Sequence, residues 1–148
     1  MKISKSVLSA LAVGMLAVSS ALAGPPVAIT FKNLGTAHAT YKIITNNEAT
    51  TNVNSAQKPV ATVKAGGADT YTVQSNLSPI ANYANLRYTI GGKTCTFQAT
   101  FVGTVGPLGS IIPKWKNTAT PSGGAVCTAK VTSTNTSTYA WAVEFTMK

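Results

Sequence analysis

The sequence predicts an all-β protein: a single-domain antiparallel β-sandwich of seven or eight strands, Ig-like or jelly-roll-like, or a small barrel, after a cleaved signal peptide. Apolar and polar residues alternate with period two in several segments, and glycine- or proline-containing turns separate these segments. After the leader, no segment of helical length carries apolar residues at a spacing of 3.6. These observations favour short strands over helices.

The first 23 residues have the order of a secretory signal peptide. A short basic start is followed by the apolar stretch Val7–Val18 and by an A-x-A pattern that ends at Ala23. The apolar stretch is shorter than the roughly 18 residues that a membrane-spanning helix needs. We therefore expect cleavage after Ala23, a secreted or periplasmic domain at residues 24–148, and no transmembrane segment in that mature chain.

The mature chain is basic and rich in lysine. Removing 23 of the 148 residues leaves 125, and the loss of Lys2 and Lys5 lowers the formal net charge from +9 to +7. Arg87 is the one arginine among its ten basic residues. Because specific reading of phosphates or bases favours the arginine fork, we expect no specific nucleic-acid partner. Diffuse lysine charge fits either self-repulsion in solution or attraction to anionic lipid, lipopolysaccharide or acidic glycan.

The period-two pattern predicts the strands in chain order. Positions expected to face inward are Val27, Ile29 and Phe31; Tyr41 and Ile43; Leu86, Tyr88 and Ile90; Cys95, Phe97, Ala99 and Phe101; and Tyr139, Trp141, Val143, Phe145 and Met147. The opposite faces carry mainly threonine, and the mature chain holds 22 threonines, whose branched Cβ favours extended backbone. One apolar and one threonine-rich face indicate sheets covered on one side.

Turn residues divide these strands. Gly91–Gly92 predicts a two-residue hairpin turn, because glycine takes positive φ at both central positions at little cost. Lys64–Asp69 predicts a second turn, between strands at Val60–Val63 and Thr70–Gln74. Three polar or Gly/Pro-rich segments are expected to be loops, the first long, exposed and able to hold a short edge strand: Asn46–Gln57, Gly103–Gly109 and Asn117–Gly124.

The two cysteines predict one disulfide bond. Cys95 and Cys127 both lie in the exported part, and an even count in an oxidising compartment favours a structural pair. Both are expected on inward faces, and the bond would close a loop of 31 intervening residues. Such a crosslink contributes about 3–4 kcal/mol by the chain-entropy estimate. The absence of a C-x-x-C motif argues against a reactive or metal-binding pair.

The titratable groups are too few for most catalytic designs. The chain has three acidic residues, Glu48, Asp69 and Glu144, and one histidine, His38. None lies in a metalloprotease, nucleophile-elbow, P-loop or dinucleotide-binding motif. We therefore expect no enzyme activity, no catalytic residue, no metal and no cofactor.

The segment Ile111–Lys116 contains the strongest candidates for surface binding. Trp115 stands between Lys114 and Lys116, so its indole could lie at headgroup depth while the flanking ammonium groups meet anionic charge. The same three side chains could also stack on a sugar or a base. The same pattern is also typical of an edge strand whose lysines prevent aggregation and whose tryptophan packs inward. Tyr83 is a second, separate candidate.

Three functional hypotheses follow. The first is a secreted or periplasmic, non-enzymatic protein that binds an anionic envelope component, membrane surface or glycan through its loops. The second is a self-associating structural subunit of a bacterial surface fibre, which the low charge density and abundant Thr, Asn and Ala also fit. The third is a periplasmic inhibitor, whose target enzyme would have to be acidic because a +7 domain repels a basic one.

Overall fold

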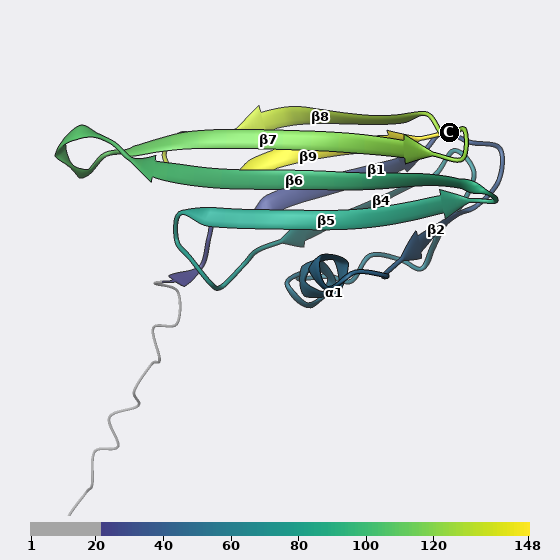
Figure 1. The fold of residues 1–148 in the computed structure, drawn as a ribbon, viewed down its shortest axis with the longest axis horizontal. Helices are drawn as coiled ribbons and strands as arrows, with labels where there is room; N and C mark the ends of the chain where they lie inside the picture. The colour runs from purple at the N-terminus through teal and green to yellow at the C-terminus, as the bar shows by residue number, and fades with distance from the viewer. Residues whose placement is uncertain (1–21) are drawn as a thin grey trace, which may run out of the picture.

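The computed structural model describes residues 22–148 of the chain. The predicted signal peptide lies almost wholly outside these residues and stays a prediction. Within them, two sheets of four and five strands pack face to face, with one short α-helix on the outside (Figure 1). The predicted β-sandwich is confirmed, with nine strands in place of seven or eight and without closure into a barrel.

The four-stranded sheet has the order β4-β1-β9-β8. Its strands are β1 (Val27–Asn33), β4 (Ala68–Val73), β8 (Cys127–Thr134) and β9 (Trp141–Met147). The first and last strands of the domain, β1 and β9, pair in parallel, whereas the other pairs in this sheet are antiparallel. The predicted antiparallel pairing therefore holds for every other pair of strands in the described sandwich, and β1–β9 is the exception.

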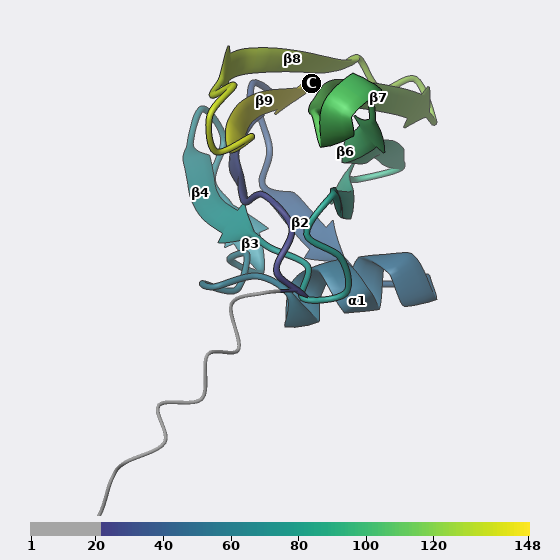
Figure 2. The ribbon, with the colours of Figure 1, turned by 90° about the vertical axis from the view of Figure 1, so that its left-hand side faces the viewer.

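The five-stranded sheet has the order β3-β2-β5-β6-β7. Its strands are β2 (Ala39–Lys42), β3 (Thr62–Val63), β5 (Ala81–Ile90), β6 (Lys93–Val105) and β7 (Ile111–Ser122). All neighbours in this sheet are antiparallel. Figure 2 shows that β7, one edge strand of this sheet, lies beside β8, one edge strand of the four-stranded sheet.

The core lies between the sheets and contains most of the predicted inward positions, together with residues that were not predicted to face inward: Ala39, Val63, Tyr71, Val73 and Ala84. Phe31 stacks on Tyr88 with ring centroids 3.5 Å apart, and Phe97 stacks on Phe145 at 4.7 Å. Each of these pairs joins one sheet to the other and supplies aromatic packing across the interface. Ile43 is an exception to the prediction, because β2 ends at Lys42 and the Ile43 side chain is exposed.

The predicted disulfide is confirmed. Cys95 on β6 is bonded to Cys127 at the start of β8, with their Cα atoms 5.8 Å apart. Cys95 belongs to the five-stranded sheet and Cys127 to the four-stranded sheet. The bond therefore joins the two layers of the sandwich covalently.

Two predicted turns are confirmed in position. Ile90 pairs with Lys93 across Gly91–Gly92, but of these two glycines only Gly91 has positive φ, at 57°. The turn therefore depends on glycine at its first central position. In the second turn, the amide of Gly67 donates to the carbonyl of Lys64 (2.9 Å), between β3 and β4.

The predicted loop at Asn46–Gln57 was wrong, because the structure has helix α1 at Asn46–Val53. Its first turn is closed by a capping box. The amide of Glu48 donates to Thr45 Oγ1 (3.3 Å), and Glu48 Oε2 accepts from the amide of Thr45 (2.9 Å). The helix packs on the outer face of β5, and this long-range contact replaces the missing apolar repeat.

The loop predicted at Gly103–Gly109 is confirmed only in its second half, because β6 continues to Val105 and the turn η2 follows. The loop predicted at Asn117–Gly124 was largely wrong, because β7 continues to Ser122. Thr118 and Thr120 pair with β6, and their branched side chains suit a strand. Pro113 and Pro121 are tolerated because β7 is an edge strand, where a missing N–H does not break a ladder on both sides.

Candidate functional site

The β6–β7 hairpin projects beyond the rest of the sandwich, as Figure 1 shows at its left-hand side. β7 pairs with β6 as far as Ile111 opposite Val105, whereas β5 accompanies β6 only as far as Val102. The amide of Gly103 still donates to the carbonyl of Ile80 (2.8 Å). Beyond Gly103, β6 and β7 pair with each other and with no third strand.

The hairpin ends in a strained turn, η2 (Pro107–Gly109). Leu108 has φ 57° and ψ 24°, Gly109 has φ 76°, and the amide of Ser110 donates to the carbonyl of Pro107 (3.3 Å). Positive φ at both central residues is typical of a type I′ turn, which favours Asn and Gly. A left-handed backbone costs a residue such as leucine about 1–2 kcal/mol. The Leu108 side chain gains no contact in return, since it is fully exposed.

Apolar side chains surround this turn. Val105 is 70% exposed, and Ile112, on the opposite face of the hairpin, is also exposed. We call Val105, Leu108 and Ile112 the apolar tip. The sequence prediction missed it, because it assigned the V-G-P-L-G run to a loop. The apolar residues inside a Gly/Pro turn were the available signal.

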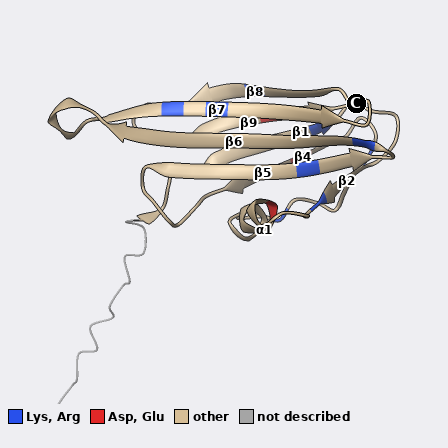
Figure 3. Cartoon of the chain, in the orientation of Figure 1, with Lys and Arg blue, Asp and Glu red and all other residues tan. Residues whose placement is uncertain are grey.

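Two lysines follow the apolar tip along β7. Lys114 and Lys116 are exposed and lie on the same face as Ile112, the outer face of the five-stranded sheet. At about 3.3 Å per residue, Lys114 stands about 10 Å from the start of β7 at Ile111. No acidic residue occurs between Lys93 and Ser122, and Figure 3 accordingly shows β7 with basic positions and no acidic ones.

Trp115 does not join these lysines. It faces the opposite side of β7, where its ring lies 5.8 Å from that of Phe101. Its Nε1 donates to the carbonyl of Tyr139 in the β8–β9 loop (3.2 Å). The structure therefore separates the predicted Lys-Trp-Lys group into an exposed basic pair and a half-buried aromatic brace between the sheets.

Tyr83 lies on the same outer face as the two lysines. It pairs with Thr100 on β6, which pairs in turn with Lys116 on β7. Strands lie about 4.8 Å apart, so Tyr83 and Lys116 are about 10 Å from each other across the sheet. Tyr83 is half-buried. Of the four candidates, Tyr83, Lys114 and Lys116 therefore share one face.

All three acidic side chains are engaged elsewhere. Glu48 bonds to Arg87 (2.9 Å), Glu144 Oε2 lies 2.6 Å from Lys32 Nζ, and Asp69 Oδ2 accepts from the amide of Val60 (2.9 Å). Within residues 22–148, neither Lys114 nor Lys116 forms a salt bridge. Their positive charge is thus not neutralised by the rest of the described domain.

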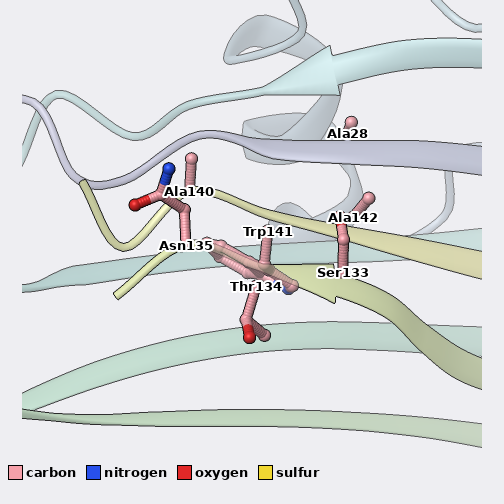
Figure 4. A pocket seen from close by; sticks show the side chains of 7 residues that line it. All are labelled: Ala28, Ser133, Thr134, Asn135, Ala140, Trp141 and Ala142. Atoms are coloured by element: carbon pink, nitrogen blue, oxygen red, sulfur yellow. The ribbon is translucent and has the colours of Figure 1, made fainter. Parts of the chain in front are cut away.

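Two hollows lie away from the hairpin. One, of about 380 Å³, lies between the β8–β9 loop and β1 (Figure 4); its lining is Ala28, Ser133, Thr134, Asn135, Ala140, Trp141 and Ala142. None of these side chains titrates in the ordinary pH range. The other, of about 340 Å³, lies at the opposite end of the sandwich; its lining is Leu34, Gly35, Thr36, Ile90, Lys93, Val126 and Lys148.

No three His, Cys, Asp or Glu side chains in residues 22–148 come together as metal ligands would. His38 is exposed in the β1–β2 connection. Across the same residues, no helix has the length and apolar character needed to cross a membrane.

Comparison with known proteins finds no matching family model, curated protein or solved structure. The fold and site define the chain as a disulfide-linked β-sandwich with a projecting, apolar-tipped and basic hairpin. The hairpin is the most distinctive feature of the described residues.

Proposed function

We propose that residues 24–148 form an exported, non-enzymatic binding domain that attaches to an anionic surface of the cell envelope through the β6–β7 hairpin. The observation that carries this proposal is the projection of the hairpin past its sheet, with Lys114 and Lys116 exposed and no acidic residue along it. A surface approaching from that end meets the hairpin first.

The charge distribution supports an anionic partner. A lysine held near an anionic membrane contributes about 1 kcal/mol to binding, and the effect fades within a Debye length. Lys114 and Lys116 together would contribute about 2 kcal/mol. Tyr83 on the same face adds an amphipathic ring of the kind enriched at membrane interfaces. We expect salt-sensitive association of moderate strength.

The arrangement of the N-terminus is compatible with export. The amide of Gly24 donates to the carbonyl of Ser75 (2.8 Å), and Gln74 Nε2 donates to the carbonyl of Gly24 (2.8 Å). Gly24 is the residue that follows the expected cleavage site, and it is buried. A new α-amino group at Gly24 would keep a donor for Ser75, so cleavage after Ala23 would leave the fold intact.

The alternative of a fibre subunit has less support. β1 lies between β4 and β9, so the chain fills the interior of its own four-stranded sheet. A polymer built by strand exchange would need a vacancy in a sheet, and a polymer built on edges would have to use β7 or β8. The basic, apolar-tipped hairpin has no evident part in either.

Binding to lipid vesicles tests the proposal. Lys114→Gln with Lys116→Gln removes two charges from the hairpin, and Lys64→Gln with Lys93→Gln removes two from the opposite end of the sandwich. We expect wild-type protein to sediment with vesicles of phosphatidylglycerol and phosphatidylcholine, but not of phosphatidylcholine alone. The hairpin variant should bind about 30-fold more weakly, as expected for the loss of about 2 kcal/mol.

The opposite-end variant is the control for net charge. It should lose much less affinity than the hairpin variant, because the charges that it removes lie far from the contact. Equal losses in the two variants would show a diffuse charge effect, and a larger loss in the control would place the contact at the other end. Either result contradicts the proposal.

A further inference from the structure

We propose that the partner is a lipid bilayer and that the apolar tip (Val105, Leu108 and Ile112) inserts into it, below the headgroups that Lys114 and Lys116 contact. This inference rests on the proposed function and makes it more specific. Charge alone would serve equally for an acidic glycan. The tip distinguishes the two, because exposed aliphatic side chains have a partner in hydrocarbon and none in a hydrated polysaccharide.

The conformation of Leu108 favours a contact outside the domain. A bulky apolar residue occupies a left-handed position that favours Asn or Gly, and its side chain is fully exposed. Neither feature helps the isolated domain to fold. Strain held at an exposed position without a compensating contact is typical of a site of interaction.

The spacing of apolar and basic residues along the hairpin suits a membrane interface. Leu108 stands at the apex, and Val105 and Ile112 lie one on each face beside it. Lys114 lies about 10 Å along β7 from its first residue, on the side away from the tip. Interfacial segments bury their apolar side about 5–10 Å into the boundary between headgroups and acyl chains. Insertion of the tip to this depth would therefore bring Lys114 to the level of the headgroups.

The brace at Trp115 also favours insertion. Its bond to the carbonyl of Tyr139 and its packing on Phe101 fix β7 against the β8–β9 loop at the level of the two lysines, on the opposite face of the strand. The exposed part of the hairpin is thus held out from the domain in one direction. A second copy of the chain is a less suitable occupant, since two such hairpins would bring their lysines together.

The substitution Leu108→Asn separates a binding role from a folding role. Asn tolerates the left-handed conformation, so the variant should unfold at a higher urea concentration than wild type. It should also partition about tenfold more weakly onto vesicles of phosphatidylglycerol and phosphatidylcholine, since it removes one aliphatic side chain from the inserted group. Leu34→Asn, at an exposed leucine of the opposite end, is the matched control and should leave partitioning unchanged.

Dextran sulfate, a soluble polyanion without hydrocarbon, separates insertion from attraction by charge. Leu108→Asn should bind it as wild type does, whereas Lys114→Gln with Lys116→Gln should bind it more weakly. Vesicle binding by Leu108→Asn at the wild-type level would overturn insertion and leave the proposed function standing. If Leu108→Asn loses as much affinity for dextran sulfate as for vesicles, insertion is also overturned. If the lysine variant keeps full affinity for both, the proposed function itself is wrong.

Discussion

The carboxylate of Glu48, only 1% exposed, accepts a hydrogen bond from Arg87 Nε at 2.9 Å and so joins helix α1 to the outer face of β5. The same carboxylate accepts from the amides of Ile44 (2.6 Å) and Thr45 (2.9 Å). Next to it, Thr51 Oγ1 accepts from the amide of Asn85 (2.8 Å). A helix without an apolar stripe is therefore held on the sheet by polar contacts.

This relationship predicts a pH-dependent stability. Burial raises the pKa of the Glu48 carboxyl, but hydrogen bonds from Thr45, Ile44 and Arg87 lower it by more, so the pKa lies below its ordinary value. A carboxyl with a lowered pKa stabilises the fold above its unfolded pKa of about 4.3, and this stability is lost as the pH falls through the folded value.

Glu48→Gln should therefore destabilise the domain at pH 7 by about 2–4 kcal/mol. We place the effect below that of a fully buried pair because the Arg87 side chain is 23% exposed. Urea unfolding at pH 7 and pH 3 measures it, and the gap between variant and wild type should narrow at pH 3. An equal difference in the free energy of unfolding at pH 7 and at pH 3 would contradict a stabilising role of the ionised Glu48 carboxylate.

Asn82 forms a second polar link, between the sheets. Its Nδ2 donates to the carbonyls of Pro25 (2.7 Å) and Val73 (3.0 Å), and its Oδ1 accepts from the amide of Ser75 (3.0 Å). Asn82→Ala leaves these buried groups unpaired and should lower the free energy of unfolding by about 2–4 kcal/mol. Asn85→Ala, at a partly exposed position of the same strand, should change it by about 0.5 kcal/mol or less. Equal effects would show that the bonds of Asn82 carry little stability.

The Cys95–Cys127 bond should stabilise the domain by constraining the unfolded chain. Replacing both cysteines by alanine is expected to lower the free energy of unfolding by about 3–4 kcal/mol. Wild-type protein unfolded in the presence of reductant should show a similar loss, which separates the crosslink from the packing of the sulfur atoms. An unchanged urea midpoint in both cases would contradict this prediction.

Trp115 is expected to support the hairpin without contacting the ligand. Trp115→Phe keeps an aromatic ring against Phe101 but removes the bond to the carbonyl of Tyr139, and should destabilise the domain by about 1 kcal/mol. Because the ring faces away from Lys114 and Lys116, vesicle affinity should stay within about twofold of wild type. That change is far smaller than the tenfold loss that corresponds to about 1.4 kcal/mol. A tenfold loss with unchanged stability would show that Trp115 itself contacts the surface.

The sandwich was predictable because period-two alternation reports directly which side of a strand is buried, as at Val27, Ile29 and Phe31. Helix α1 was missed because its support is long-range: Glu48 bonds to Arg87, 39 residues away. The spacing of Thr45 and Glu48 was the available local signal, since it is that of a capping box.

The site was predictable only in part. Lys114 and Lys116 were identified because they lie close together in the sequence. Trp115 was grouped with them for the same reason, but neighbouring residues of a strand point to opposite faces. Tyr83 joins the lysines through strand pairing, which sequence spacing does not reveal. The apolar tip depends on how far β6 and β7 extend beyond β5, and that is a property of the sheet register.

Amide hydrogen exchange in the presence of vesicles tests the central claim most directly. On vesicles of phosphatidylglycerol and phosphatidylcholine, we predict slower exchange in peptides that span Thr104 to Lys116, and unchanged exchange at the turns of the opposite end, Lys64–Gly67 and Gly91–Gly92. Protection at those turns, or no protection of the hairpin while the protein is bound, would contradict the account.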